Sequence, residues 1–201
     1  MAVNDLGLTH DANAWAALHD GIEDGISAYA AASEALFLLL LAALFVVVWG
    51  RLRTVARRAA VAAGASAGIA LLIGQVLSRL VDRPRPFVAH PDLVHLFAPH
   101  AADASFPSDH TTAAFAIATA ILLRNRLWGV LTLAAAAALG ASRVVIGVHY
   151  PLDVLAGAVL GSGVALALYA PATRRITDRI ADVSGAALDG TVVRVRAALG
   201  R

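Results

Sequence analysis

The sequence predicts an all-α integral membrane protein, a helical bundle of five transmembrane helices, or six, with an interfacial helix at the N-terminus. Three observations support this prediction. Hydrophobic residues make up 59% of the 201 residues and charged residues only 15%, the mean hydropathy is +0.73, and long apolar runs alternate with short groups of arginines. A soluble domain of this length could not bury so much apolar surface.

The first 33 residues differ from the rest because they contain no arginine and several acidic residues. A signal peptide needs a basic region before its apolar core, so this segment is not predicted to be one. We expect an interfacial segment over residues 1–33. The first transmembrane span runs from about Ala30 to Trp49, because about 20 apolar residues are enough to cross a hydrocarbon core of ~30 Å.

Four more apolar runs follow, at residues 59–78, 111–123, 127–148 and 151–170. The second is rich in Ala and Gly, a composition that lets helices pack closely in lipid. The third is short unless it starts near Ser108. The last segment, 171–201, is a basic tail, expected to be an amphipathic helix or a disordered arm on the cytoplasmic side. The predicted division is therefore an N-terminal segment over 1–33, a membrane domain over 34–170 and this tail.

All sixteen basic residues are arginines, and five spans divide them between two sides. Twelve lie after the first span, after the third span and in the tail, so the positive-inside rule puts that side in the cytoplasm. The other side holds Asp153, all seven histidines and the remaining four arginines, which are Arg79, Arg83, Arg85 and Arg143. We therefore expect a functional site at the extracytoplasmic face. The net charge of +2 is small, which argues against a nucleic-acid partner.

Ionisable residues beside long apolar runs are costly and therefore point to function. Converging guanidinium groups match phosphate oxygens, and Ser108 and the N–H groups at the start of the third span can add neutral donors. Two histidines, His110 and His149, suggest that one attacks phosphorus and the other protonates the leaving oxygen. Asp153 follows His149 by four residues and can hold one imidazole nitrogen.

This chemistry requires no metal ion, because arginines can themselves neutralise the charge of the transition state. A further set of histidines, His90, His95 and His100, occurs at a spacing of five residues, which fits no usual metal-ligand pattern. We predict neither a metal nor a cofactor. The absence of cysteine leaves the cellular compartment undecided.

The polar blocks resemble the three signatures of the type-2 phosphatidic acid phosphatase superfamily. These blocks are Arg85-Pro86, Pro107-Ser108-Asp109-His110, and Ser142-Arg143 with His149 and Asp153. They occur in the family's order. The general signatures have Lys where this chain has Ser78, and Gly where it has Asp109, so Arg79 is the candidate to replace the missing lysine. Both departures are similar to the bacitracin-resistance type of undecaprenyl-diphosphate phosphatase.

The resemblance implies the fold of this superfamily and a metal-independent lipid phosphatase. The expected enzyme removes the terminal phosphate of undecaprenyl diphosphate at the extracytoplasmic face of a bacterial cell membrane, through a phosphohistidine, and recycles the lipid carrier for cell-wall synthesis. The resemblance implies His149 as nucleophile, Asp153 as its orienting partner and His110 as general acid. The residues implied to bind phosphate are Arg79, Arg85, Ser108, Asp109 and Arg143.

Several alternatives stay open. The substrate can instead be phosphatidylglycerophosphate, phosphatidic acid or a polyprenyl-phosphosugar, because nothing in the chain reads the lipid tail. A non-catalytic lipid-binding protein is the alternative of another class. Asp109 can simply cap the third span, and Arg83 can contact substrate, a lipid headgroup or Asp82. Membrane lipids and a lipid substrate are the expected partners, and the sequence does not predict an oligomeric state.

Overall fold

The computed structural model describes residues 4–48 and 50–199, and the regular elements in this part of the chain are helices. They are α1 (Asp5–Ala17), α2 (Asp20–Val46), the short 3-10 helix η1 (Gly50–Leu52), α3 (Arg53–Val81), α4 (Pro86–Ala89), α5 (Asp109–Leu122), α6 (Arg126–Val145), α7 (Pro151–Leu168) and α8 (Pro171–Leu199). The predicted all-α class is confirmed.

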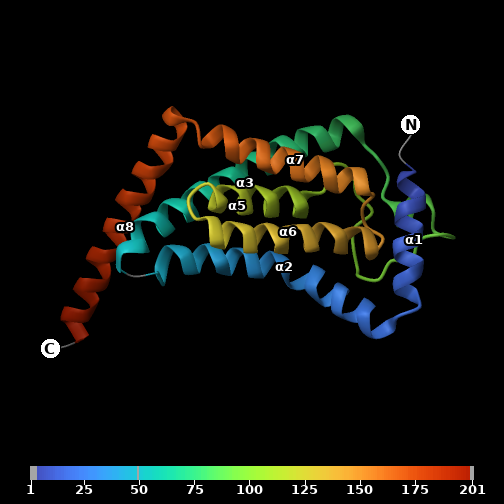
Figure 1. The fold of residues 1–201 in the computed structure, drawn as a ribbon, viewed down its shortest axis with the longest axis horizontal. Coiled ribbons are helices and arrows are strands. Elements are labelled where there is room, and N and C mark those ends of the chain that lie inside the picture. Colours follow the sequence, from blue (N-terminus) through green and yellow to red (C-terminus); the bar gives the residue numbers. More distant parts are fainter. Residues whose placement is uncertain (1–3, 49, 200–201) are drawn as a thin grey trace.

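Five helices run alongside one another as a bundle, with α1 lying across one end and α8 across the other (Figure 1). α5 is the central helix, since it packs against α7, α3 and α6. Its buried side chains are small or branched, among them Ala116, Ala118 and Ile121. Small side chains let the surrounding backbones approach α5 closely.

Within residues 4–48 and 50–199, four segments are long and apolar enough to cross a membrane, namely α2, residues 53–89, α6 and α7. The third predicted span is α5, which has 14 residues and is therefore only ~21 Å long. It begins at Asp109, next to the Ser108 from which a longer third span was expected to start. A helix shorter than the hydrocarbon core fits here because its neighbours enclose it.

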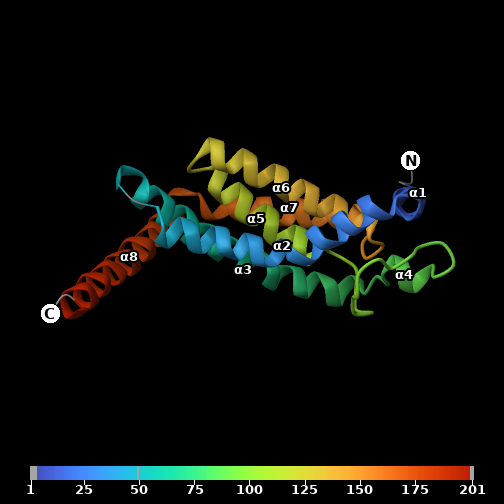
Figure 2. The same ribbon diagram turned by 90° about the horizontal axis from the view of Figure 1, so that it is seen from below.

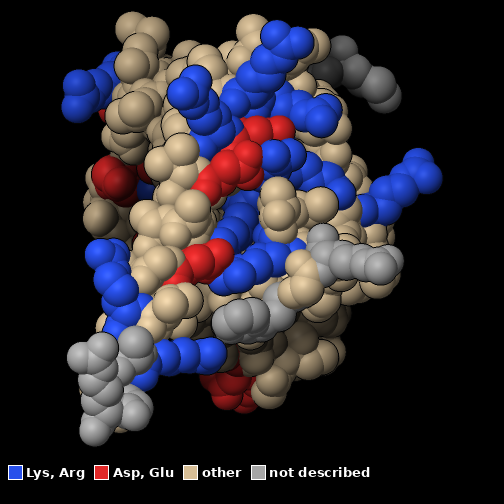
Figure 3. Space-filling model, turned by 90° about the vertical axis from the view of Figure 1, so that its left-hand side faces the viewer, with Lys and Arg blue, Asp and Glu red and all other residues tan. Residues whose placement is uncertain are grey.

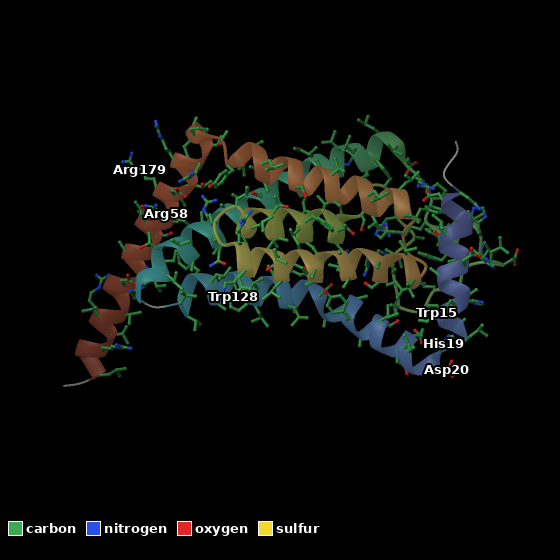
Figure 4. All side chains as sticks on the ribbon, in the orientation of Figure 1. Trp15, His19, Asp20, Arg58, Trp128 and Arg179 are labelled. Carbon is green, nitrogen blue, oxygen red and sulfur yellow. The ribbon has the colours of Figure 1, made fainter. Side chains whose placement is uncertain are left out.

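The N-terminal segment folds into two helices rather than one interfacial piece. α1 is separate, whereas α2 begins at Asp20, ahead of the start near Ala30 that the apolar run suggested. No proline interrupts residues 20–46, so the helix extends back into the acidic stretch. Trp15 and His19 stack with ring centroids 4.7 Å apart at the corner between α1 and α2 (Figure 4). The three-part division of the chain stays a prediction.

Backbone breaks at the α1 end bring the polar blocks together. α3 ends at Val81, the next residue Asp82 has a left-handed φ of 43°, and Pro84 follows. Arg85 is extended, and α4 begins at Pro86. α7 likewise begins with a proline after the extended Tyr150. Proline fits only the first turn of a helix. Pro84 therefore cannot continue α3, and Pro86 and Pro151 each begin a new helix, so the chain turns at this end of the bundle. Figure 2 shows the α4 region and α1 at this same end.

Paired charges gather at the opposite end, where α8 crosses α3. Arg57 and Arg58 bond to Asp189 and Asp182, each at 2.7 Å, and Arg124 bonds to Asp178 at 2.6 Å. Figure 3 shows this end, with acidic groups set among arginines. The basic tail is thus a helix rather than a disordered arm. Of the arginines expected here, Arg201 and the side chain of Arg51 lie outside the described residues.

Candidate active site

His149 lies in the loop between α6 and α7 and is only 2% exposed. Its Nδ1 is 2.8 Å from the backbone oxygen of Ser105. A carbonyl can only accept, so Nδ1 carries the proton and Nε2 holds the free lone pair. This neutral tautomer is the form that an attacking imidazole needs.

The turn before His149 depends on Gly147, whose φ is +82°. An added Cβ would lie 2.5 Å from the backbone oxygen of His95. Only glycine adopts this conformation without strain and leaves room for that oxygen. The glycine therefore lets the chain reverse between Arg143 and His149 within a few residues.

Asp153 holds the turn around His149, but no hydrogen bond joins it to the imidazole. Its Oδ2 lies 3.9 Å from His149 Nδ1, beyond hydrogen-bond distance. Oδ2 instead accepts from the Ser105 hydroxyl at 2.6 Å and from the Tyr150 N–H at 2.9 Å. Oδ1 accepts from Arg83 at 2.9 Å. The link from Asp153 to the histidine therefore passes through Ser105.

Ser105 is a fully buried residue whose role the signature spacing did not reveal. Its N–H donates to the backbone oxygen of Arg83 at 2.7 Å, its carbonyl accepts from His149, and its hydroxyl donates to Asp153. One serine thus connects the segment after α3, the loop that carries His149 and the start of α7. The sequence singled it out only as a member of the block from Ala104 to His110, which resembles the bacitracin-resistance type, and assigned it no role.

Arg85 lies against the histidine and is 5% exposed. Its NH1 donates to His149 Nε2 at 3.1 Å and to the backbone oxygen of Val148 at 3.0 Å. Its Nε donates to Asp103 at 2.8 Å. A guanidinium beside the attacking nitrogen is well placed to hold the oxygens of a phosphate there.

Arg143 is 4% exposed, and its Nε and NH2 have no hydrogen-bond partner among the described residues. Leaving a buried cation unpaired is costly. Its charge, like that of Arg85, acts on His149. The two unpaired nitrogens therefore make Arg143 a candidate anion-binding group at this end of the bundle.

The second histidine, His110, lies in the first turn of α5 and lines a cavity of about 400 Å³. His100, from the loop before α5, has its ring centroid 6.4 Å from those of both His110 and His149. From the sequence, His100 was weighed only as a metal ligand, and its spacing argued against that role. Among the described residues, no group of three or more His, Cys, Asp or Glu is arranged to hold a metal ion.

The remaining predicted phosphate ligands take different places. Ser108 is fully buried, is the N-cap residue of α5, and donates its N–H to the backbone oxygen of Asp153 at 3.1 Å. Asp109 is the first helical residue rather than the cap, and it accepts from Gln75 at 2.9 Å. Arg79 is exposed, one turn beyond Gln75 on α3. No described contact joins Arg79 to the cluster.

Burial and nearby cations favour the neutral forms of His149 and His100. Burial, with the charges of Arg85 and Arg143, lowers the pKa of His149 well below its ordinary 6.5. Burial and the Arg85 charge also lower the pKa of His100. Burial raises the pKa of the Asp103 carboxyl, but the hydrogen bond and the charge of Arg85 outweigh this and lower that pKa overall. The site thus sets the neutral imidazoles of His149 and His100 beside the cations Arg85 and Arg143.

The comparison with protein families decides between the alternatives for this geometry. Residues 59–176, which include Arg85, Ser105, His110, Arg143, His149 and Asp153, match the family described as the PAP2 superfamily. The chain belongs to the PAP2 superfamily. The family resemblance of its three polar blocks is thereby confirmed.

Curated PAP2 relatives are similar over much of the chain. It is 42% identical to the undecaprenyl-diphosphatase BcrC of Bacillus subtilis over 148 residues. This stretch covers 70% of this chain and 68% of that protein. It is 39% identical over 119 residues to the putative undecaprenyl-diphosphatase YbjG of Escherichia coli, which is 59% of each chain.

Solved structures agree with the PAP2 fold. LpxE of Aquifex aeolicus superposes with a TM-score of 0.65 at 26% identity, over 83% of this chain and 98% of that one. A transmembrane PAP2-type phosphatidylglycerolphosphate phosphatase from Bacillus subtilis superposes with a TM-score of 0.53 at 21% identity, over 81% and 83%. Together with the apolar helices, these matches establish a multi-pass membrane protein.

Proposed function

We propose that the protein is a membrane lipid phosphatase that removes the terminal phosphate of a polyprenyl diphosphate, in the manner of the named undecaprenyl-diphosphatases. The observation that carries the proposal is the buried, incompletely bonded Arg143 beside a neutral imidazole. An unpaired cation next to a nucleophile calls for an anionic, electrophilic group, which a phosphate is.

In the first step Nε2 of His149 attacks the terminal phosphorus. The bond from that phosphorus to the bridging oxygen breaks, and the lipid leaves as a monophosphate that takes a proton from His110. The Nδ1–H bond to Ser105 leaves the attacking nitrogen unprotonated and holds the ring in place, and the Arg85 bond to Nε2 moves to a phosphate oxygen as the substrate binds. Arg85 and Arg143 bind the oxygens on which negative charge is concentrated in the transition state.

In the second step water attacks the phosphohistidine. His110, now neutral, accepts a proton from that water, and the bond between phosphorus and Nε2 breaks. Inorganic phosphate leaves, and the imidazole returns to its neutral form. Ser108 and Arg79 are proposed as additional phosphate contacts, and Asp109 is proposed to border the same site. These groups carry the reaction without a metal or cofactor.

An apolar cavity beside His110 supports a long-chain substrate. It lies between α2, α3 and α5, and its lining changes from polar to apolar. Its polar residues are Asp109, His110, Gln75, Ser33 and Glu34, and its apolar residues include Phe37, Leu38, Leu41, Leu71, Ala113 and Ile117. Such a cavity suits a lipid whose head is at the histidines and whose tail extends between helices.

The orientation follows from charge. The end of the bundle away from the site carries Arg53, Arg57, Arg58 and the arginines of α8 (Figure 3). By the positive-inside rule that end faces the cytoplasm. We therefore place the active site at the extracytoplasmic face of a bacterial cell membrane, where the enzyme returns the lipid carrier for cell-wall synthesis.

The test is phosphate release by purified protein in detergent with EDTA, using undecaprenyl diphosphate, phosphatidylglycerophosphate and phosphatidic acid in parallel. We expect preferential release from the diphosphate, and none from the His149→Ala variant. Release from the glycerolipids alone would give the same chemistry another substrate. No release from any lipid would favour a binding protein, and an absolute need for Mg²⁺ would contradict the metal-free mechanism.

A further inference from the structure

The N-terminal helix α1 precedes the family match, yet its polar side chains are buried against the active site. Asp5, Thr9 and Asn13 are 8%, 0% and 0% exposed. Asn13 donates to the backbone oxygens of His95 and Val145, both at 2.8 Å, and accepts from the His95 N–H at 2.8 Å. These three bonds attach α1 to the end of α6 and to the loop beside it.

Asp5 makes two bonds to the nucleophile region. Its Oδ1 accepts from the N–H of Leu152 at 3.0 Å, in the first turn of α7. Its Oδ2 accepts from Arg83 NH2 at 2.6 Å. One carboxylate therefore holds both the backbone at the start of α7 and a guanidinium.

Arg83 links Asp5 to the residues around His149. Its NH1 donates to Asp153 Oδ1 at 2.9 Å, and its guanidinium carbon lies 3.7 Å from the centre of the Tyr150 ring. The other oxygen of Asp153 is bonded to Ser105, whose carbonyl holds the imidazole of His149. A continuous series of bonds thus connects α1 with the nucleophile.

We propose that Asp5 is a positioning residue for the nucleophile, acting through Arg83 and Asp153. This inference rests on the proposed function, since it assigns Asp5 to the orientation of His149 in that reaction. An arginine makes its bonds in a fixed planar fork. The bond between Asp5 and Arg83 NH2 therefore fixes the orientation in which NH1 donates to Asp153.

The proposal predicts a loss of rate rather than of substrate binding. Asp5→Asn keeps an oxygen for the Leu152 N–H but removes the charge that holds Arg83. Because a small misplacement of a reacting group is costly, we expect kcat to fall about ten- to a hundredfold with KM nearly unchanged. Asp11→Asn is the matched control, since Asp11 lies in the same helix with a side chain that is 80% exposed.

A double-variant comparison separates positioning from general stability. If Asp5 acts through Arg83, Asp5→Asn should have little further effect on kcat in an Arg83→Gln background. Thermal midpoints in detergent report folding of each variant. If Asp5→Asn does not fold, Arg83→Lys tests the same contact, because a lysine lacks the planar fork of separate nitrogens that fixes Asp5 and Asp153 relative to each other.

Wild-type kcat in the Asp5→Asn variant, or losses that simply multiply in the double variant, would overturn the proposal. The same assay keeps the two proposals apart. If the wild type releases no phosphate from any lipid, the proposed function fails. If the wild type is active and Asp5→Asn is equally active, only the positioning role fails.

Discussion

At the scale of single residues, the state of His149 is set by its surroundings rather than by its distance from an acid. Its Nδ1–H is fixed by a backbone oxygen, and Arg85 donates to Nε2. A positive neighbour on the attacking nitrogen disfavours protonation there. The imidazole is therefore ready to attack at pH values where an exposed histidine would already be charged.

This state predicts a pH profile. The lowered pKa of His149 means that the neutral form persists as the pH falls below 6.5. The acidic limb of kcat/KM should therefore lie below pH 6.5, with full activity retained at that pH. The assay follows release from farnesyl diphosphate between about pH 4 and pH 8, with the titration of the substrate phosphate measured separately by ³¹P NMR. A limb at or above 6.5 that the substrate does not explain would contradict this account.

The sequence predicted that Arg85, His149 and Asp153 would lie together but not how they would bond, and it grouped Arg79 with them although no described contact joins it. The spacing of His149 and Asp153 across Pro151 placed them in one turn, yet the turn directs the carboxylate to the Tyr150 N–H and to Ser105. Arg83 was left with three alternatives because its partner Asp5 lies 78 residues away. Contacts across such distances carry no local pattern, so only the fold reveals them.

At the scale of elements, α5 and α7 approach closely because α7 presents glycines to α5. A Cβ added at Gly161 would lie 2.2 Å from the backbone oxygen of Thr112, and one at Gly157 would lie 2.7 Å from that of Ser108. The two glycines are four residues apart, so they occupy one face of the helix. Close packing here holds Ser108 and Asp153 at the distance at which their backbones bond.

Gly161→Val should therefore separate α5 from α7. We expect a loss of about 1–3 kcal/mol in stability from overpacking and a loss of activity, because the ends of both helices carry site residues. Gly163→Val is the control, since a Cβ there has nothing within 4 Å. Thermal unfolding in detergent measures both variants. An equal effect on the two would show that the glycine contact is unimportant.

Helix composition predicted most elements and misjudged the start of α2. The long apolar spans were clear from hydropathy, whereas α5 is short and enclosed, so its length is set by its neighbours rather than by the bilayer. The acidic start of α2 hid a helix that begins at Asp20. Hydropathy reports the part of a helix that faces lipid and misses its polar extension.

At the scale of the whole molecule, the two ends of the bundle serve different purposes and a cavity enters it from one of them. The cavity reaches from Asp109 and His110 along α3 to Gly64. Gly64 lies 11 residues before Gln75, a distance of about 16 Å along a helix. Only a substrate with a long tail can extend this far from the histidines.

Filling the far end of the cavity should therefore discriminate by chain length. Gly64→Phe adds a ring where a Cβ meets nothing within 4 Å. We expect KM for undecaprenyl diphosphate to rise about tenfold, the effect of roughly 1.4 kcal/mol, while hydrolysis of isopentenyl diphosphate is unchanged. Gly68→Phe is the matched control on α3, because Gly68 is equally open but does not line the cavity. Equal KM values for the long lipid in wild type and Gly64→Phe would exclude this path.

If Arg85 binds phosphate as proposed, its pairing with Asp103 makes substrate binding an exchange of anions. An arriving phosphate gains the Nε of Arg85 only as the carboxylate leaves it, so part of the affinity for substrate and for inorganic phosphate alike is spent on that displacement. Asp103 stays attached to the loop beside the site and is always at high local concentration. It therefore competes with the product at the end of each cycle, and the site favours rapid clearance of phosphate over tight retention.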